Sequence, residues 1–276
     1  MTASNRDPGA IFRALHQPGN PFVLANAWDV GSARVLAALG AQALATSSAA
    51  HGFTMGRPDQ GNVTRDEALA HAQDLIAATP LPVSGDFENG FGHSPEECAE
   101  TVRLSGEIGL AGICIEDAAL PEDRAYPFQE AVERVRAAAA AARALKSDFF
   151  FVARADGMMN GHYDFDEALR RLVAFQDAGA DGIYAPYPPS LSHLARICAA
   201  TTVPVNVLVA GPMSQHSRTQ FATAGVSRIS LGSALARRTH RTLVETTQNI
   251  LNGDFTELGN AFPGADMDKL LAKGSQ

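Results

Sequence analysis

Short apolar runs rich in β-branched and aromatic residues alternate with alanine-rich amphipathic stretches along most of this chain. The apolar runs predict eight strands, at 22–26, 41–46, 82–86, 111–116, 149–153, 181–185, 203–207 and 227–231. The stretches between them predict helices, most clearly at 64–78, 95–108, 128–145 and 164–178. Three helices open with capping pairs, which are Thr64 with Glu67, Ser94 with Glu97, and Asp164 with Glu167.

Strands that alternate with helices pair in parallel, and eight repeats predict an α/β fold of the (β/α)8 TIM-barrel type. A doubly wound open sheet is the alternative, but no G-x-G-x-x-G follows the first strand. A length of 276 residues suits one barrel as well as it suits two domains. We therefore expect a single (β/α)8 barrel domain over residues 1–276, with 236–276 as a C-terminal helical extension.

The charge and cysteine content narrow the class of protein. A net charge of −8 argues against nucleic acid or an anionic membrane as partner. The longest bland run, AAAAAARAL at 137–145, is too short to span a bilayer. Three widely spaced cysteines without a CxxC pair predict free thiols in a reducing cytoplasm. Of these, Cys98 and Cys114 are expected to be packing residues.

Acidic residues gather where the predicted strands end. The active sites of such barrels lie at the C-terminal ends of the strands. Asp86, Glu88 and Glu116 follow the third and fourth strands, and Asp59 follows the second. Crowded carboxylates repel one another unless protons or a cation neutralise them, and oxygen ligands suit Mg2+ better than zinc. The alternative is that these acids cap loops or pair with arginines.

Possible anion-binding groups follow the second and fifth strands. Arg154 ends the fifth strand, where a guanidinium binds a substrate carboxylate through two parallel hydrogen bonds. Ser47 and Ser48 offer further donors for the same anion. The alternatives are an arginine bound only to the acids and a polar turn with no ligand.

Several mechanisms are excluded by what the sequence lacks. The three lysines, Lys146, Lys269 and Lys273, do not follow any predicted strand, so a Schiff-base aldolase is not expected. HExxH, GxSxG and GxxxxGK[ST] motifs do not occur, which argues against a zinc protease, a serine hydrolase and a P-loop enzyme.

The motifs together resemble the isocitrate lyase/phosphoenolpyruvate mutase superfamily. They are NAWDVGSARVLAALGAQALATSSAA at 26–50, GRPDQG at 56–61, GDFENGFG at 85–92, GICIED at 112–117 and FVARADG at 151–157. The resemblance implies a barrel whose eighth helix is exchanged between subunits of a homodimer or homotetramer. It also implies a Mg2+ or Mn2+ site that holds a 2-oxo acid or its enolate.

Individual roles follow from the same resemblance. Asp59, Asp86, Glu88 and Glu116 are similar to the acids around the metal, with Asp86 as the direct ligand and Glu88 in place of a usual aspartate. Six residues are similar to the positions that bind substrate in this superfamily, namely Trp28, Asp29, Ser47, Ser48, Arg154 and Asn206.

The loop after the fourth strand lacks the motifs that are typical of the lyases and the mutases of this superfamily. It reads EDAALPEDRAYPF, without the KRCGH stretch of the lyases or the K-x-N-S pattern of the mutases. Within it, Arg124 and Tyr126 are the candidate catalytic residues beside Arg154. The segment from Ala118 to Phe128 has few evident apolar anchors and is expected to be a mobile gate.

These observations predict a Mg2+-dependent lyase. Its substrate would be a 2-oxo or 2-hydroxy dicarboxylic acid, cleaved at a C–C bond through a pyruvate-type enolate, as in oxaloacetate decarboxylation or in the cleavage of substituted malates or methylisocitrate. One alternative is P–C bond chemistry, as in phosphonopyruvate hydrolase or phosphoenolpyruvate mutase. Another is a 2-oxo-acid-binding protein with little turnover.

Overall fold

The strands form one parallel barrel, described in a computed structural model that covers residues 7–276. They are β1 (Phe22–Asn26), β2 (Leu44–Ala45), β3 (Val83–Asp86), β4 (Gly112–Glu116), β5 (Phe150–Arg154), β6 (Gly182–Tyr184), β7 (Asn206–Leu208) and β8 (Arg228–Ser230). Every ladder is parallel, in the order β6-β5-β4-β3-β2-β1-β8-β7. A parallel bridge between Ile183 and Val205 joins β6 to the segment before β7. The predicted (β/α)8 fold is confirmed.

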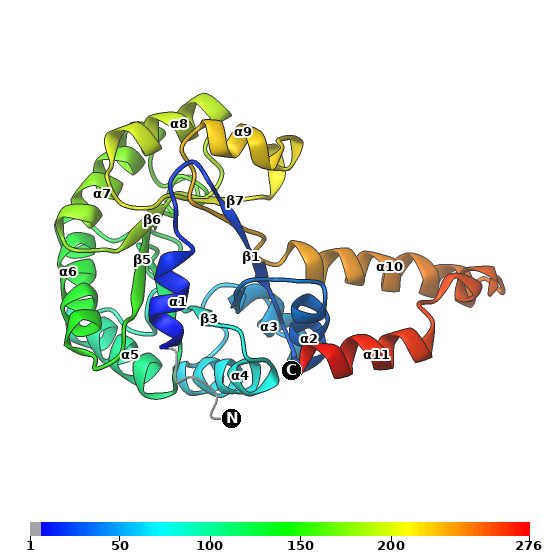
Figure 1. Cartoon of the computed structure of the whole chain (residues 1–276). Coiled ribbons are helices and arrows are strands. Elements are labelled where there is room, and N and C mark those ends of the chain that lie inside the picture. Colours follow the sequence, from blue (N-terminus) through cyan, green and yellow to red (C-terminus); the bar gives the residue numbers. More distant parts are fainter. Residues whose placement is uncertain (1–6) are drawn as a thin grey trace.

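Helices surround the barrel (Figure 1). They are α1 (Pro8–Ala14), α2 (Val30–Ala38), α3 (Ser48–Thr54), α4 (Arg65–Ala78), α5 (Pro95–Glu107), α6 (Phe128–Ala144), α7 (Phe165–Asp177), α8 (Leu191–Ala200), η1 (Gly211–Gln215), α9 (Arg218–Thr223), α10 (Ala234–Leu251), η2 (Thr256–Asn260) and α11 (Gly264–Gly274). The four helices expected most clearly agree with α4, α5, α6 and α7 to within one residue at each end. Thr64, Ser94 and Asp164 each accept a hydrogen bond from the expected glutamate amide, so these caps are confirmed.

The interior of the barrel changes character along its axis. At the N-terminal end of the strands, Phe12 of α1 packs edge-to-face against Phe22 and Phe150, with ring centroids 6.1 and 5.9 Å apart. Towards the other end the inward positions become small or polar, as at Ala45 and Cys114. The barrel is therefore filled by side chains at the N-terminal ends of the strands and open at their C-terminal ends, which leaves room for a site there.

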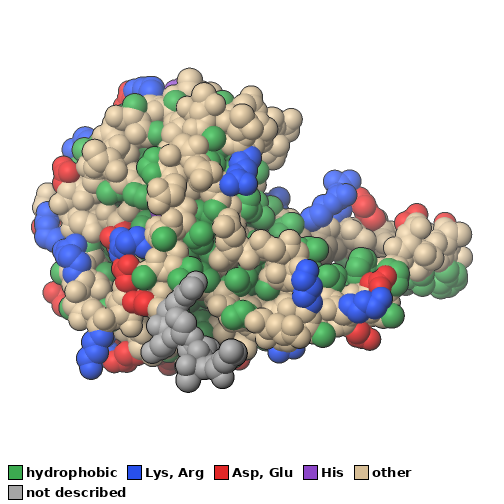
Figure 2. Space-filling model, viewed as in Figure 1, with side chains coloured by type: hydrophobic (Ala, Val, Ile, Leu, Met, Phe, Trp, Pro, Cys, Tyr) green, Lys and Arg blue, Asp and Glu red, His purple; other side chains and the backbone are tan. Residues whose placement is uncertain are grey.

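The chain after β8 forms an arm that leaves the barrel. Helix α10 projects outwards, and α11 returns to pack on α2 (Figure 1). Apolar side chains are exposed along this arm and at its tip (Figure 2), namely Leu243, Val244, Leu251, Phe255, Leu258 and Phe262. The eighth helix of the repeat thus does not lie beside its own β8, as exchange between subunits requires. The exchange itself stays a prediction. No helix of residues 7–276 is long and apolar enough to cross a membrane.

Candidate active site

A cavity of about 190 Å³ lies at the C-terminal ends of the strands. It is lined by seven of the residues that the sequence pointed to, which are Ser47, Ser48, Asp59, Asp86, Glu88, Glu116 and Arg154. Asp86, Glu116 and Arg154 end β3, β4 and β5, and the other four lie in the segments that follow β2 and β3. The structure thus brings these acids and Arg154 together at this end of the barrel.

Arg154 is at the centre of the charged cluster. Its Nη1 donates to Oδ1 of Asp86 at 2.7 Å, and its Nη2 lies 3.0 Å from Oε2 of Glu116. Asp156 accepts from Nε at 3.1 Å and from Nη2 at 2.6 Å. The Arg154 guanidinium lies over the ring of Tyr184, with the guanidinium carbon 5.1 Å from the ring centroid. Arg154 therefore pairs with three carboxylates at once, and its Nη1 also lies 3.9 Å from Sγ of Cys114.

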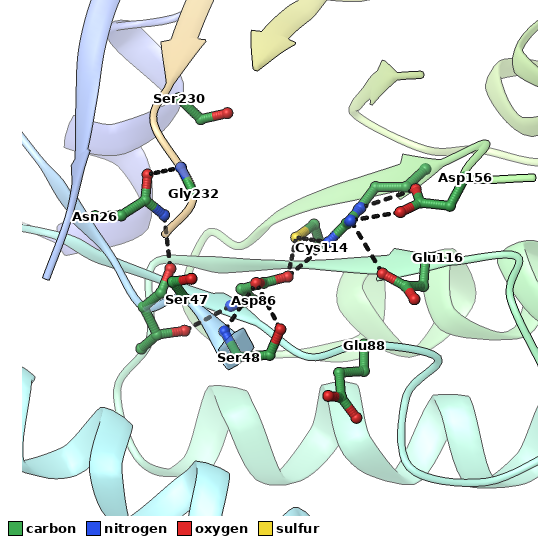
Figure 3. A network of polar contacts seen from close by, with 12 residues as sticks. Asn26, Ser47, Ser48, Asp86, Glu88, Cys114, Glu116, Asp156, Ser230 and Gly232 are labelled. Atoms are coloured by element: carbon green, nitrogen blue, oxygen red, sulfur yellow. Dashed lines mark hydrogen bonds and ion pairs between the residues drawn. The ribbon is translucent and has the colours of Figure 1, made fainter. Parts of the chain in front are cut away.

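Asp86 is held by donors on both carboxylate oxygens (Figure 3). The backbone N–H and the hydroxyl of Ser48 both donate to Oδ2 at 3.0 Å. The thiol of Cys114 lies 3.4 Å from Oδ1, the oxygen that also accepts from Arg154. Thr46 fixes the backbone, because its hydroxyl accepts from the Asp86 amide at 2.7 Å. Ser48 thus orients Asp86 in this structure, where the sequence suggested a donor to the substrate.

The conformation of the turn after β3 requires the glycine that follows Asp86 and Glu88 in the sequence. Glu88 has a φ of 44°, in the left-handed region that non-glycine residues seldom adopt. Its carbonyl accepts from the Glu116 amide at 2.8 Å, and its side chain accepts from the Gly61 amide at 3.2 Å. Gly90 has a φ of 83°, and a Cβ there would lie 3.1 Å from Sγ of Cys98. A glycine is therefore needed for the turn to pack against α5 and to bring Glu88 into the cavity.

Burial makes the carboxyl groups of the cluster hold protons more tightly than usual. It raises the pKa of Glu88 to about 7, an effect to which the charges of Asp86 and Asp59 add. It also raises the pKa of Asp59, and it raises the pKa of Glu116 well above its usual value although Arg154 opposes this. The pKa of Asp156 rises to about 6 for the same reason. The cavity therefore carries more carboxylate than its arginines neutralise, which favours a cation or protons.

The donor set fits a hard divalent cation bound largely through water. Within residues 7–276, no three or more His, Cys, Asp and Glu side chains stand close enough to enclose a metal ion by themselves. The acids around Asp86 instead surround an open, partly polar cavity. Mg2+ is bound in this way in many proteins, by one or two carboxylates and several waters.

Three predicted substrate-binding residues do not line the cavity. Asp29 is exposed and caps α2, with Oδ1 2.6 Å from the Ser32 amide. Trp28 directs its carbonyl to Nε2 of His71 at 3.0 Å. Asn206 is buried and contacts two residues that do line the cavity, Ser230 and Arg228, at 2.9 Å each.

The loop after β4 is anchored more firmly than expected. Ala118, Ala119, Leu120 and Tyr126 are all buried, and Ala118 bridges to Ala125. The expectation of few apolar anchors is therefore wrong, because apolar residues at both ends of the loop pack into the core. The tip, residues 121–124, is exposed, as is Pro127 just before α6.

The two candidate catalytic residues of this loop are not brought to the cavity. The Tyr126 hydroxyl accepts from Nδ2 of Asn89 at 3.1 Å and lies 2.8 Å from Nδ1 of His93. Arg124 is exposed, with its guanidinium carbon 5.6 Å from the Tyr126 ring centroid. Neither residue lines the cavity, and the Tyr126 hydroxyl is engaged by Asn89 and His93, so the structure does not support a catalytic part for either.

Sequence reasoning missed several residues that line the cavity, among them Cys114 and Arg228. Cys114 was expected to be a packing residue, as Cys98 is, yet it contacts Asp86. Burial and the Asp86 charge raise the pKa of the Cys114 thiol to about 12, so the thiol stays protonated. Arg228 also lines the cavity. Cys114 lies two residues before Glu116 on β4, and Arg228 lies two residues before Ser230 on β8, which also lines the cavity. Side chains two apart on a strand point the same way, so strand alternation could have indicated both.

Comparison with known proteins assigns the family. The family model described as phosphoenolpyruvate phosphomutase matches residues 12–251. An uncharacterised protein of Mycobacterium tuberculosis is 34% identical, over 80% of this chain and 81% of its own. An oxaloacetate decarboxylase of Chromohalobacter salexigens is 28% identical, over 84% of this chain and 82% of its own.

A solved structure from Burkholderia cenocepacia J2315, described only as a lyase/mutase, is 42% identical. It has a TM-score of 0.91 and covers 96% of this chain and 95% of its own. Sequence and fold thus agree over nearly the whole barrel. The chain belongs to the phosphoenolpyruvate phosphomutase family, within the superfamily of enzymes that its motifs resemble.

Proposed function

We propose that this protein is a lyase that cleaves a C–C bond of a small 2-oxo or 2-hydroxy dicarboxylic acid, with decarboxylation of oxaloacetate as its reaction. The observation that carries the proposal is the cluster of acids held around Arg154 in one cavity. Similarity to an oxaloacetate decarboxylase over most of both chains supports it. Substituted malates and methylisocitrate are the other candidate substrates.

The residues of the cluster would bind a divalent cation, Mg2+ or Mn2+. Asp86 would be the direct ligand, with Asp59, Glu88 and Glu116 around it. When bound, such a cation supplies positive charge that stabilises an enolate. Arg154 and Ser48 keep the Asp86 carboxylate in a fixed orientation, which removes the cost of arranging it during the reaction.

Decarboxylation makes few demands on the loop residues. The C3–C4 bond of oxaloacetate breaks, CO2 leaves, and the bonding pair becomes the enolate of pyruvate. No general base is needed to begin this step, which agrees with a loop that lacks the lyase cysteine and places Tyr126 elsewhere. Nη1 of Arg154, which faces Asp86 and the weakly accepting sulfur of Cys114, would also contact the substrate carboxylate.

A reaction panel tests the proposal. The protein is incubated with Mg2+ and, separately, oxaloacetate, substituted malates, methylisocitrate and phosphonopyruvate. Pyruvate, glyoxylate and phosphate are measured against blanks that contain Mg2+ without protein. Pyruvate above the blank from oxaloacetate supports the proposal. Phosphate from phosphonopyruvate would instead support P–C bond chemistry, which the match to the phosphomutase family model favours as the second candidate.

We also propose that the protein is a homodimer or homotetramer in which the arm of α10 and α11 packs on another copy. The exposed apolar side chains of the arm support this, because patches of this kind mark interaction surfaces. Light scattering coupled to size exclusion tests it, with Leu251→Asp and Phe255→Asp as variants expected to shift the assembly to monomer. The cytoplasmic location stays a prediction.

A further inference from the structure

Arg228 is a buried cation without a carboxylate partner. It opens β8, its residue is 3% exposed, and it lines the cavity. Its Nε donates to Oδ1 of Asn206 at 2.9 Å, and its Nη1 lies 3.5 Å from Nε2 of His16. Within residues 7–276 it makes no ion pair, and its Nη2 has no hydrogen-bond partner.

The other buried arginines are satisfied differently. Arg154 pairs with three carboxylates, and Arg171 pairs with Asp117 and Glu167. Arg134 donates to the backbone carbonyls of the turn after β3. Arg228 differs from all three because its partners are only one amide oxygen and one imidazole nitrogen, and its Nη2 has none. A buried charge with so few partners is costly to keep.

His16 does not compensate this charge. Its Nδ1 lies 2.8 Å from the Phe12 carbonyl, to which it donates, so Nε2 presents a lone pair to Arg228. Burial and the nearby guanidinium lower the pKa of His16 to about 2. The imidazole is therefore a neutral acceptor over the whole physiological range, and the positive charge of Arg228 is left for an anion.

The cavity that holds the acid cluster also reaches this arginine. Arg228 pairs in register with Phe22, at the start of β1, and Asp86 is the last residue of β3. Arg228 thus lies deeper along the barrel axis than Asp86, and the small residues Ala45, Gly85 and Cys114 line the cavity beside them. A barrel interior is normally filled by bulky apolar side chains, so an open path that ends at a guanidinium is unusual.

Asn206 fixes a second donor next to Arg228. Its Oδ1 accepts from Arg228, and its Nδ2 donates to Oγ of Ser230 at 2.9 Å. Because Ser230 accepts through Oγ, its own O–H hydrogen is left to donate. Ser230 lines the cavity as Arg228 does. The Asn206 amide therefore orients the Arg228 guanidinium and the Ser230 hydroxyl, and each of these two groups keeps a hydrogen-bond donor for a ligand.

We propose that Arg228 and Ser230 form an anion subsite at the inner end of the cavity that binds the second carboxylate of the substrate, with Asn206 as the positioning residue. The planar guanidinium and the hydroxyl match the geometry of a carboxylate. The subsite selects diacids over monoacids of the same length. This inference rests on the proposed function, since it takes the substrate to be a 2-oxo acid.

Matched ligand pairs test the subsite. Each pair differs only in the second carboxylate: 2-oxoglutarate against 2-oxopentanoate, and oxaloacetate against 2-oxobutanoate. Binding of the first pair is measured by calorimetry with Mg2+ present, and oxaloacetate and 2-oxobutanoate are compared as substrate and competitive inhibitor. Arg228→Met is expected to weaken the binding of diacids about 10- to 100-fold, which is the loss that one charge-assisted contact produces. The affinity for monoacids is expected to stay within about twofold of that of the parent.

The alternatives give different results. Equal weakening of diacids and monoacids would mean that Arg228 acts only through its field on the acid cluster, and it would overturn the subsite. Unchanged diacid preference in Arg228→Met would overturn it too. If the parent protein binds none of the four acids, the proposed function falls with it, whereas a parent that prefers diacids leaves the proposed function standing whatever the variant shows.

Two further variants guard against a failure to fold. Arg228→Lys keeps the buried charge and loses the planar fork, and Ser230→Ala removes the hydroxyl alone. Each is expected to reduce the diacid preference at least severalfold while its thermal unfolding stays close to that of the parent. A full diacid preference in both variants would overturn the subsite even where Arg228→Met does not fold.

Discussion

Sγ of Cys114 lies 3.4 Å from Oδ1 of Asp86, inside the cavity that we assign to catalysis. The thiol is a donor to a carboxylate here, because burial and the Asp86 charge raise its pKa to about 12. A cysteine among active-site residues usually invites assignment as a nucleophile, but a thiolate is required for that chemistry. The geometry gives Cys114 a different part, which is to help hold Asp86 in place.

We therefore predict that Cys114 resists alkylation in the folded protein. Iodoacetamide at pH 8 should modify it far more slowly than a free cysteine, since thiolate is scarce at that pH. Mass spectrometry of peptides measures the modification, and protein unfolded in guanidinium provides the fully reactive control. Rapid modification of Cys114 in the folded protein would contradict the assignment.

The metal prediction concerns Asp86. EDTA treatment and Asp86→Ala are each expected to abolish turnover, because the direct ligand or the cation is lost. Glu88→Asp should be milder, since a water-bridged position tolerates a shorter side chain. Binding of Mn2+, followed by electron paramagnetic resonance, gives a readout independent of activity. Undiminished turnover after both treatments would remove the metal from the proposal.

Arg154 should not be replaceable by lysine. An ammonium keeps the charge but cannot pair with Asp86, Glu116 and Asp156 in the observed geometry. Loss of one charge-assisted bond, about 1.5–3 kcal/mol, should weaken substrate binding about tenfold or more in Arg154→Lys. Steady-state kinetics measures this, with Arg170→Lys on the exposed surface as the control.

Removing the charge of Arg154 should also destabilise the fold. Arg154→Met leaves three buried carboxylates without their partner, which typically lowers the free energy of unfolding by about 3–5 kcal/mol. Chemical denaturation tests this. If Arg154→Lys has the kinetic constants of the parent and Arg154→Met has its stability, then Arg154 contributes neither to substrate binding nor to the stability of the fold.

Glu88 should make the metal-free protein less stable as the pH rises. Its pKa is raised in the folded state to about 7, so between about pH 4.5 and 7 the folded state binds more protons than the unfolded state. The contribution is therefore fully present below this window and is lost through it, by up to about 3 kcal/mol. Buried His16 acts in the opposite direction, because its pKa is lowered.

A difference measurement isolates the glutamate. The free energy of unfolding is measured in EDTA against pH for the parent and for Glu88→Gln, which is neutral at every pH. The parent should lose stability relative to the variant from pH 4.5 to 7. Parallel curves would show that the pKa of Glu88 is not raised in the folded protein.

The loop after β4 gives the last prediction. Tyr126→Phe should retain turnover within a few-fold, because the hydroxyl contacts Asn89 and His93 outside the cavity. It should cost about 1 kcal/mol of stability through the lost hydrogen bonds. Arg124→Ala should leave both quantities nearly unchanged. A loss of several orders of magnitude in turnover from either variant would restore a catalytic acid to this loop.

The positions of the strands and of the acids follow from local features that a sequence displays. Eight apolar runs and three capping pairs are enough to place the barrel and several helix ends, and chemistry at the strand ends then brings Asp86, Glu116 and Arg154 together. Arg154 shows where this reasoning stops, because the sequence does not reveal how many carboxylates it binds.

What could not be predicted depends on packing between distant segments. The sequence makes Tyr126 a candidate catalytic residue, but Asn89 and His93 of another loop bind its hydroxyl. Arg228 lies in a segment whose sequence predicts an ordinary core strand. Its lack of a carboxylate partner is visible only once Asn206 of β7 and His16, which follows α1, are placed beside it.

The bridge between Ala118 and Ala125 closes the base of the loop after β4, and residues 121–124 beyond it are exposed. Lengthening such a tip is cheap, because the entropy of closing a loop grows only slowly with its length. A segment that carries an acid or a lysine can therefore be grafted between Pro121 and Arg124 while the barrel keeps its packing. This makes the tip the natural place to engineer a new reaction on an unchanged charged platform.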